Sequence, residues 1–331
     1  MSTPTELARK THHRVLVTSR SFSTGTRRLT EELTNSGIEV VRGPADHNLV
    51  ALAELLPDVD GWIAGTGPIT DALLALAPHL KVIARYGVGV DAVDLVAADR
   101  RGVVVTNTPG ANSGAVADHA IALLLSALRD VAAGDRRVRD GRWTVQRTRE
   151  LSGLTVGIIG FGRIGRGVAA RLTGFGCRVL AVDPFLATAD IANGGAEPSS
   201  AEKIIEASDV ISVHTPGDQL IVDEHWLHRV RPGLILVNTA RADLVDEEAL
   251  AAALRDGRVA KYAADTLASE SGTASPLLAE DLVDQVTVTP HSAAQTVEAV
   301  DLMGGAAVAT VKSVLIAHEQ PAHRVAIREP A

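Results

Sequence analysis

The sequence predicts an α/β protein of two domains, each built around a parallel sheet that helices cover on both faces. Three observations predict this class. The chain has 331 residues, a length that favours two domains over one. Short aliphatic runs alternate with helical patterns, first in one series and then in a second. Aromatic residues make up only 3%, and an aliphatic bias suits strands that are buried on both faces.

The first series ends before residue 108. Five aliphatic runs are expected as strands: 14–19, 38–41, 60–65, 80–85 and 102–107. Helical patterns lie between them, for example at 26–37, which Gly37 ends, and at 69–79. Because strands that alternate with helices form parallel sheets, we expect a small flavodoxin-like α/β unit here.

A long helix is expected over 113–141, because its apolar residues recur at helical spacing. It ends in a basic stretch that contains Arg136, Arg137 and Arg139. This stretch is either a solvated helix end or part of an arm that contacts a second subunit. A last helix over 294–317 has no strand after it, so we expect it to pack back onto the first series.

The second series contains six more aliphatic runs that are expected as strands: 154–159, 178–183, 210–214, 234–240, 261–267 and 286–290. Helices fit between each pair, which predicts a doubly wound parallel sheet of Rossmann type. The predicted domains are therefore 1–107 plus 291–331, which is discontinuous, and 108–290, with the arm around 113–150.

Composition excludes several classes of function. Lys and Arg number 32 against 40 Asp and Glu, and the net charge of −8 argues against a general nucleic-acid surface. The one cysteine, Cys177, can form neither a disulfide within the chain nor a thiolate metal cage. The N-terminus has no signal-peptide pattern, and the longest apolar run, Ala120 to Leu128, is too short to span a membrane. We expect a cytoplasmic protein with no nucleic-acid, membrane or metal partner.

A glycine motif, GFGRIG, follows the strand 154–159 and opens an amphipathic helix. The first glycine permits a tight turn, the second lets a pyrophosphate approach the backbone, and the third lets the helix pack on the strand. The phosphates would then lie at the helix N-terminus. The alternative is a glycine-rich turn without a ligand. The expected cofactor contacts are Gly160, Gly162, Arg163, Ile164 and Gly165.

Asp183 ends the next strand, 18 residues after Gly165. A carboxylate at this spacing hydrogen-bonds the adenosine ribose and repels a 2′-phosphate. No arginine follows in the run PFLATAD to receive such a phosphate. The sequence therefore predicts NAD rather than NADP as the cofactor.

Three polar residues, Arg241, Glu270 and His291, follow the ends of later strands in the second series. The carboxyl ends of parallel strands form the crevice in which ligands bind. A guanidinium at the end of a buried strand needs an anion, and the sequence around Arg241 offers only Asp243. We expect the partner of Arg241 to be the substrate.

At these residues the chain resembles the NAD-dependent D-2-hydroxyacid dehydrogenases. The similar motifs are RYGVGVDAVD (85–94), TNTPGANSGAVADHAIALLL (106–125), LTVGIIGFGRIG (154–165), VHTP (213–216), LVNTARADLVDEEALAAAL (236–254) and VTPHSAAQT (288–296). Within the family, the chain looks most like phosphoglycerate-dehydrogenase-like proteins of the short kind, which lack a C-terminal regulatory domain.

The resemblance implies a role for each of the three polar residues. Arg241 would bind the substrate carboxylate and polarise the 2-oxo group, a task that suits a planar guanidinium better than an ammonium. His291 would move the proton between the 2-oxygen and the enzyme, and Glu270 would favour the protonated imidazole. A structural carboxylate partner for Arg241, a structural histidine and an exposed loop glutamate are the corresponding alternatives.

The resemblance also implies supporting contacts. Asp265 would contact the nicotinamide carboxamide, and Thr215, Pro216, Thr239 and Ala240 would line the nucleotide. Val88 and Gly89 would offer backbone N–H groups to the substrate carboxylate. Asn112 would touch substrate or fix domain closure, which would exclude water from the reaction. The family resemblance further implies a homodimer.

Some positions depart from the family pattern. An aromatic residue and a Glu-x-Glu-Pro motif commonly surround the position of Glu270, whereas this chain has ASESGTASP. Ser292, Ala293 and Ala294 replace glycines that commonly follow the histidine. Arg85 precedes the substrate loop, where it could bind a phosphate or second acid group of the substrate, as in 3-phosphoglycerate, or form a salt bridge that holds the loop.

The sequence favours an enzyme that reduces a 2-oxo acid with NADH, or runs the reverse reaction. The alternative is an NAD(H)-sensing binding protein of the same fold that acts through protein partners, since such relatives can retain all three polar residues. Oxidation of formate or phosphite is a third hypothesis. A glutamate beside His291 weakens the formate version, because formate-oxidising relatives usually have glutamine there.

Overall fold

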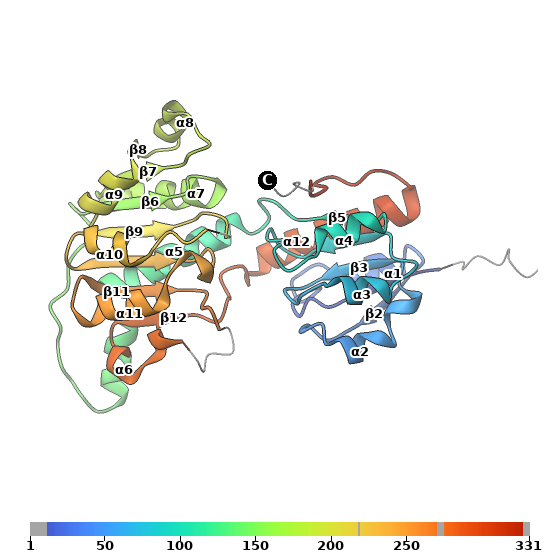
Figure 1. Cartoon of the computed structure of the whole chain (residues 1–331), viewed down its shortest axis with the longest axis horizontal. Coiled ribbons are helices and arrows are strands. Elements are labelled where there is room, and N and C mark those ends of the chain that lie inside the picture. Colours follow the sequence, from blue (N-terminus) through green and yellow to red (C-terminus); the bar gives the residue numbers. More distant parts are fainter. Residues whose placement is uncertain (1–11, 218, 270–274, 327–331) are drawn as a thin grey trace, which may run out of the picture. The chain divides into compact units, whose positions relative to one another are not determined.

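The computed structural model describes residues 12–217, 219–269 and 275–326 (Figure 1). The described residues form two compact units. Unit 1 contains those up to Asn112 and those from Gln295 onward, and unit 2 is Ser113–Ala294. The units thus divide at 112/113 and 294/295, whereas the sequence pattern predicts boundaries at 107/108 and 290/291.

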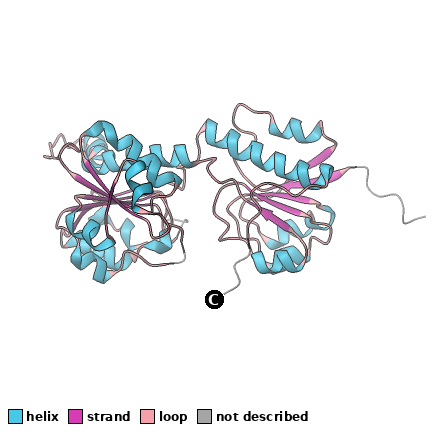
Figure 2. Cartoon of the chain, turned by 90° about the horizontal axis from the view of Figure 1, so that it is seen from above, coloured by secondary structure: helices cyan, strands magenta, loops and turns pink. Residues whose placement is uncertain are grey.

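Unit 1 contains a five-stranded parallel sheet in the order β2-β1-β3-β4-β5. The strands are β1 His13–Val17, β2 Ile38–Arg42, β3 Gly61–Ala64, β4 Val82–Arg85 and β5 Val104–Thr106. β3 and β4 are buried along their whole length, because helices cover both faces of the sheet (Figure 2). The strand order is that of flavodoxin-like folds, as predicted.

The helices of unit 1 are α1 Leu29–Thr34, α2 Leu49–Ala53, α3 Asp71–Ala75, α4 Leu95–Arg100 and α12 Val297–Lys312, which a π-helical turn, Ser313–Ala317, extends. Four of these helices begin at a residue whose side chain accepts backbone N–H bonds of the first turn. The capping residues are Asn48, Thr70, Asp94 and Thr296.

The C-terminal helix packs in unit 1, as the lack of a following strand predicts. The hydroxyl of Tyr86, which follows β4, donates to the carbonyl of Val300 on α12 at 2.9 Å. Val297–Ala317 is a longer apolar helix than the run 120–128, and its mean hydropathy of 1.6 would suit a membrane span. Half of it is buried inside unit 1, which is typical of a core helix.

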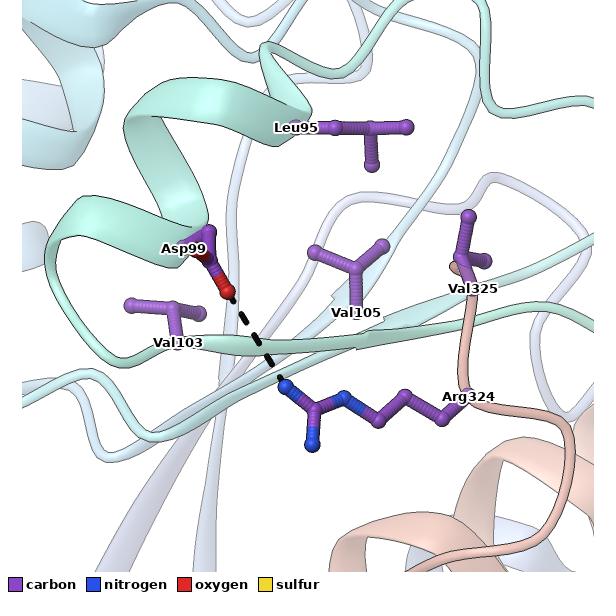
Figure 3. Close-up of a pocket in the computed structure, with 6 residues that line it drawn as sticks. All are labelled: Leu95, Asp99, Val103, Val105, Arg324 and Val325. Carbon is purple, nitrogen blue, oxygen red and sulfur yellow. Dashed lines mark ion pairs between the residues drawn. The ribbon is translucent and has the colours of Figure 1, made fainter. Parts of the chain in front are cut away.

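The segment after α12 covers the β5 edge of the sheet. Arg324 bridges Thr106 in antiparallel fashion, and the N–H of Val325 donates to the carbonyl of Val105 at 2.8 Å. Figure 3 shows Arg324 extending toward Asp99 of α4, at an N···O distance of 4.0 Å, beside a small pocket. This segment therefore occupies the hydrogen-bonding groups that an edge strand would expose.

Unit 2 contains a seven-stranded parallel sheet in the order β12-β11-β10-β9-β6-β7-β8. The strands are β6 Thr155–Ile159, β7 Arg178–Val182, β8 Glu197–Pro198, β9 Val210–Val213, β10 Leu234–Asn238, β11 Val259–Ala264 and β12 Val286–Val288. The order reverses between β6 and β9, as in doubly wound dinucleotide-binding folds, which confirms the predicted class. β8 is not predicted, because two residues give no periodic signal.

The helices of unit 2 are α5 Ser113–Leu128, α6 Val131–Arg139, α7 Arg163–Leu172, α8 Thr188–Asn193, α9 Ala201–Ala207, α10 Glu224–Arg229 and α11 Glu247–Arg255. They cover both faces of the sheet (Figure 2). α5 lies against α7 and against β10 and β11, so it is a core helix.

The prediction of a single helix over 113–141 is wrong, because α5 and α6 are separated at Asp130, whose φ of 59° is left-handed. Aspartate tolerates this conformation better than most residues. Its buried carboxylate bonds Lys261 Nζ at 2.6 Å and also pairs with Arg137. Arg137 is therefore a structural partner of Asp130 and not a solvated helix end.

Candidate active site

The glycine turn lies at the reversal of strand order in unit 2. Gly160 has a φ of 89°, a conformation that glycine adopts without strain. A Cβ there would lie 2.7 Å from the carbonyl carbon of His214, at the end of β9. The turn therefore needs glycine both for its conformation and for its approach to the β9 loop.

Gly162 and Gly165 have different requirements. A Cβ on Gly165 would lie 3.2 Å from Ile158 Cγ2 and closer still to the carbonyl of Gly160, so this glycine lets α7 pack on β6. A Cβ on Gly162, the residue before α7, would meet no atom within 4 Å. Packing within the protein does not require glycine at 162, which fits a ligand that approaches the backbone there. Arg163 and Ile164 form the first turn of α7.

Asp183 follows β7 and binds the glycine turn. Its Oδ2 atom accepts the N–H of Phe161 at 2.9 Å, and its Oδ1 atom accepts the N–H of Phe185 at 2.9 Å. Each carboxylate oxygen can accept more than one hydrogen bond, so the ribose contact remains open to it. Besides its predicted role, this carboxylate holds the turn in place.

The loop after β9 contains His214, Thr215 and Pro216. The N–H of His214 donates to Ile159 at 2.7 Å, and its Nε2 atom lies 2.8 Å from Ser212 Oγ. Burial lowers the pKa of His214 to about 4, so the imidazole is neutral at physiological pH. Its Nδ1 atom is buried without a hydrogen-bond partner among the described residues.

This histidine predicts a loss of stability in acid. Because the pKa of His214 is about 4 in the folded protein against 6.5 ordinarily, the unfolded chain binds the proton first. Its contribution to the free energy of unfolding is therefore complete above pH 6.5 and decreases as the pH falls toward 4, where it levels off. Urea midpoints of wild type and His214→Asn, measured across this range, should converge as the pH falls.

The exposed His228 provides the matched control, since its ring bonds the carbonyl of Glu224 one turn earlier on the surface of α10. His228→Asn makes the same substitution without removing a buried imidazole, so the convergence toward low pH is expected for His214→Asn in particular. A constant difference between wild type and His214→Asn would contradict the role of burial.

The β10 end presents Arg241 on a tightly held loop. Asn238, which is fully buried, donates from Nδ2 to the carbonyl of Arg241 at 2.7 Å and accepts the N–H of Ala240 at 2.9 Å. The guanidinium of Arg241 donates to the carbonyl of Ala240 at 2.8 Å. A Cβ on Gly217 would lie 3.2 Å from Arg241 Cγ, so the β9 loop closes against this side chain.

The β11 and β12 ends are joined through Asp265. Its Oδ1 atom accepts Thr289 Oγ1 at 2.5 Å and the N–H of Ser292 at 2.9 Å, and its Oδ2 atom accepts the N–H of Ala293 at 2.8 Å. The N–H of His291 donates to the carbonyl of Asp265 at 3.0 Å. The Asp265 carboxylate thus lies inside the loop that carries His291. Its contact with the nicotinamide stays a prediction.

His291 is exposed and has a φ of 51°. Histidine adopts the left-handed region more readily than most residues, and the bonds to Asp265 hold the turn around it. Ser292 and Ala293 stand where relatives commonly have glycine, and neither has a positive φ. The turn uses only their backbone N–H groups, so the departure leaves its geometry intact.

Buried hydroxyl groups line the same edge of the sheet. The Oγ1 atoms of Thr215, Thr239 and Thr266 lie just after β9, β10 and β11, and none has a hydrogen-bond partner among residues 12–217, 219–269 and 275–326. Buried polar groups are normally hydrogen-bonded. Together with the open space at Gly162, these hydroxyls fit a polar ligand such as a dinucleotide at this edge.

Arg241 and His291 lie on the same carboxyl edge, because β10 and β12 are parallel and only β11 separates them. Neighbouring strands are about 4.8 Å apart, so the two loops start roughly 10 Å apart. A fixed cation and an imidazole at this spacing can contact the two ends of a small acid. Glu270, the third predicted catalytic residue, lies outside the described residues.

Unit 1 contains four of the five residues predicted to bind substrate, and Arg241 of unit 2 is the fifth. Arg85 ends β4 and is 8% exposed, and its Nη1 atom donates to the carbonyls of Ala64 at 3.2 Å and Tyr86 at 2.9 Å. These bonds tie it to the end of β3 and to its own loop. Val88 is exposed, and the side chain of Asn107 donates to its carbonyl at 2.8 Å. Gly89 lies in the same loop.

Asn112 is the last residue of unit 1 before α5. Its Oδ1 atom is buried with no hydrogen-bond partner in the described part of the chain. The substrate roles of Arg85, Val88, Gly89 and Asn112 stay predictions.

Sequence reasoning misses two residues of this region. Asn238 fixes the Arg241 loop, and His119 of α5 lies 2.8 Å from Thr289 Oγ1 through its Nε2 atom. Asn238 precedes Arg241 closely enough to have been suspected. His119 is 170 residues away from its partner, and only the folded chain brings them together.

Comparison with known proteins identifies relatives of this chain. Residues 121–293 match the family profile described as D-isomer specific 2-hydroxyacid dehydrogenase, NAD binding domain. The chain is 43% identical over 270 residues to D-3-phosphoglycerate dehydrogenase of Mycobacterium leprae, which covers 80% of this chain and 50% of that protein. The chain therefore spans about half the length of this curated relative.

A shorter relative is matched over more of its length. The chain is 37% identical over 258 residues to glyoxylate reductase of Korarchaeum cryptofilum, covering 75% of this chain and 77% of that protein. Among solved structures, D-lactate dehydrogenase of Aquifex aeolicus complexed with NAD and lactic acid is similar at a TM-score of 0.79 and 26% identity. That match covers 92% of this chain and 95% of the other.

Proposed function

The chain belongs to the D-isomer specific 2-hydroxyacid dehydrogenase family, and from this premise we propose that it is an NAD-dependent enzyme that interconverts a 2-oxo acid and a D-2-hydroxy acid. The observation that carries the proposal is the placement of Arg241 and His291 on one carboxyl edge of the unit 2 sheet. The glycine turn that suits a pyrophosphate lies on the same edge.

Each of the two residues has a definite task in this proposal. Arg241 binds the substrate carboxylate through its planar guanidinium and draws electron density from the 2-oxo group. His291 gives its proton to the 2-oxygen during reduction and takes it back during oxidation. Glu270 favours the protonated imidazole in the same proposal.

The fold supplies the cofactor site. The Gly160–Gly165 turn and the N-terminus of α7 hold the pyrophosphate, and Asp183 holds the adenosine ribose. In the same proposal Thr215, Pro216, Thr239 and Ala240 line the nucleotide, and Asp265 contacts the nicotinamide carboxamide. When bound, the nicotinamide supplies or accepts the hydride, which no protein side chain can do.

For the substrate we propose a doubly anionic acid, with 3-phosphoglycerate as the first candidate. The support is the 43% identity to a D-3-phosphoglycerate dehydrogenase and the buried cation Arg85 in unit 1, which the sequence predicts to bind a second acid group. Glyoxylate is the second candidate, since a glyoxylate reductase is 37% identical. A reducing cytoplasm is the proposed location, because the one cysteine suits it.

A substrate panel tests the function. The protein is mixed with NADH and, in turn, 3-phosphohydroxypyruvate, glyoxylate, hydroxypyruvate and pyruvate, and the loss of NADH absorbance is followed. We expect turnover with at least one acid and the highest kcat/KM with the phosphorylated one. Tight NADH binding without turnover on any acid would favour the NAD(H)-sensing protein instead. Reduction of NAD in the presence of formate or phosphite would favour the hypothesis that the protein oxidises one of these two compounds.

The charge of Asp183 is expected to set the preference for NADH over NADPH. Replacing it by alanine or asparagine removes the charge that repels a 2′-phosphate, so the ratio of kcat/KM for NADPH to that for NADH should rise by about ten-fold or more. Asparagine keeps an oxygen that can accept the N–H of Phe161 or Phe185. If Asp183→Asn keeps the wild-type ratio while Asp183→Ala does not, the residue acts by holding the turn and not by its charge.

We propose that the stretch after α6 is an arm that contacts a second copy of the chain. Trp143 and Val145 are 83% and 89% exposed there, a solvent exposure that an interface would remove. Sedimentation equilibrium is expected to show a dimer for wild type and weaker association for Trp143→Ser with Val145→Ser. A monomeric wild type would contradict the proposed arm.

A further inference from the structure

The side chain of His119 makes a hydrogen bond to a residue outside its own helix, α5. It lies six residues after Ser113, on the helix with which the chain enters unit 2. Its Nε2 atom lies 2.8 Å from Thr289 Oγ1 and 3.5 Å from Asp265 Oδ1. Thr289 and Asp265 belong to the ends of β12 and β11, just before the chain leaves unit 2 at Ala294.

The positions of the protons in these contacts follow from which atoms can donate a hydrogen bond and which can only accept one. Thr289 Oγ1 lies 2.5 Å from Asp265 Oδ1, and a carboxylate oxygen can only accept there, so the hydroxyl proton of Thr289 lies between these two atoms. Thr289 then has no proton to offer His119. The Nε2 atom of His119 then carries a proton and donates it to Thr289 Oγ1.

Asp265 connects the Thr289 side chain to the loop that carries His291. Its carboxylate accepts three groups: the Thr289 hydroxyl and the N–H groups of Ser292 and Ala293. Its carbonyl accepts the N–H of His291. His291 has a φ of 51°, a left-handed conformation that is unfavourable for most residues and persists where surrounding bonds hold it. A change in the Thr289 side chain therefore reaches the turn that carries His291 through the Asp265 carboxylate, while the N–H of His291 also bonds the backbone carbonyl of Thr289 at 2.9 Å.

We propose that His119 is a positioning residue, which holds the reactive geometry of His291 through Thr289 and Asp265. The inference rests on the proposed function, since it assigns His291 the proton transfer. His119 touches neither substrate nor cofactor in this proposal. Its hydrogen bond fixes the rotamer of Thr289, so that the Asp265 carboxylate stays aligned with the two backbone N–H groups beyond His291.

The test uses paired substitutions in the full chain. His119→Leu removes the donor, whereas His119→Gln keeps an N–H close to the position of Nε2. Thr289→Val removes the relay, whereas Thr289→Ser keeps it. His228→Leu, on the exposed side of α10, controls for loss of a histidine from unit 2. For each variant we measure kcat and KM with the best 2-oxo acid, the Kd for NADH, and amide hydrogen exchange over the segment 288–296.

We expect kcat to fall about ten-fold in His119→Leu and in Thr289→Val, because small displacements of a reacting group cost rate without weakening binding. The Kd for NADH should change less than kcat does, since only the proposed Asp265 contact to the carboxamide is near the change and the pyrophosphate and ribose contacts are remote from it. Exchange over 288–296 should accelerate in both variants. His119→Gln and Thr289→Ser should recover most of the rate, and His119→Leu with Thr289→Val should lose no more than either alone.

Wild-type kcat and exchange in His119→Leu would overturn the proposal, as would equal losses in His119→Leu and His119→Gln. An additive double variant would also overturn it, because the two residues would then act separately. A failure of the proposed function would give a different result from a failure of the His119 proposal. A wild type without turnover on any acid removes the catalytic assignment, while the exchange measurements still decide whether His119 orders the loop.

Discussion

Replacing Arg241 by alanine is expected to lower kcat/KM for the 2-oxo acid by about a thousand-fold. The guanidinium binds the substrate carboxylate and stabilises charge that develops on the 2-oxygen, and removal of a preorganised donor of this kind costs about 10²–10³ in rate. Lysine should restore little of it, because an ammonium lacks the planar fork that pairs with a carboxylate. Steady-state kinetics with the best acid of the panel measures both variants.

The fold should survive this change, which makes the result interpretable. The Arg241 loop is held through its backbone carbonyl by Asn238, and alanine keeps that bond. The Kd for NADH is therefore expected to stay near wild type. Arg231→Ala is the matched control, since Arg231 pairs with Asp209 at the opposite edge of the sheet and Asp209 retains Arg149. An Arg241→Ala enzyme with wild-type kcat/KM would remove this residue from substrate binding.

Replacing His291 by asparagine is expected to lower kcat by about a thousand-fold, within the range that general acid–base catalysis contributes. Asparagine is the sharper choice than alanine, because it also tolerates the left-handed backbone at a φ of 51°. The variant thus loses the proton carrier and keeps the turn. Single-turnover reduction of the acid with saturating NADH separates the chemical step from binding.

His318→Asn is the matched control for this substitution. His318 has a φ of 56° at the end of the π-helical turn in unit 1, so the same change is made on the same backbone conformation. It is expected to leave kcat unchanged. If His291→Asn and His318→Asn behaved alike, the histidine would be a turn residue and not the proton carrier.

Much of the fold can be predicted because its strands are buried on both faces. β9 and β10 are buried along their whole length, so their aliphatic runs stand out from the amphipathic helices beside them. The glycine motif is predictable for a similar reason. Two of its three glycines meet local demands, namely the φ of 89° at Gly160 and the close packing at Gly165.

What the sequence misses depends on contacts between distant residues. The break at Asp130 is fixed partly by Lys261, 131 residues later, and no helical period reveals it. The link from His119 to Thr289 spans 170 residues. Asp265 is singled out by its motif, but the groups that its carboxylate accepts appear only when β11 and β12 lie side by side.

The most direct test of the dehydrogenase account follows the hydrogen itself. NADH that carries deuterium at the transferable position of the nicotinamide is incubated with the protein and the best acid of the panel, and the product is analysed by mass spectrometry and chiral chromatography. The account predicts a D-2-hydroxy acid with the deuterium bonded to C2. Recovery of every acid unreduced, with the deuterated NADH bound but intact, would contradict it.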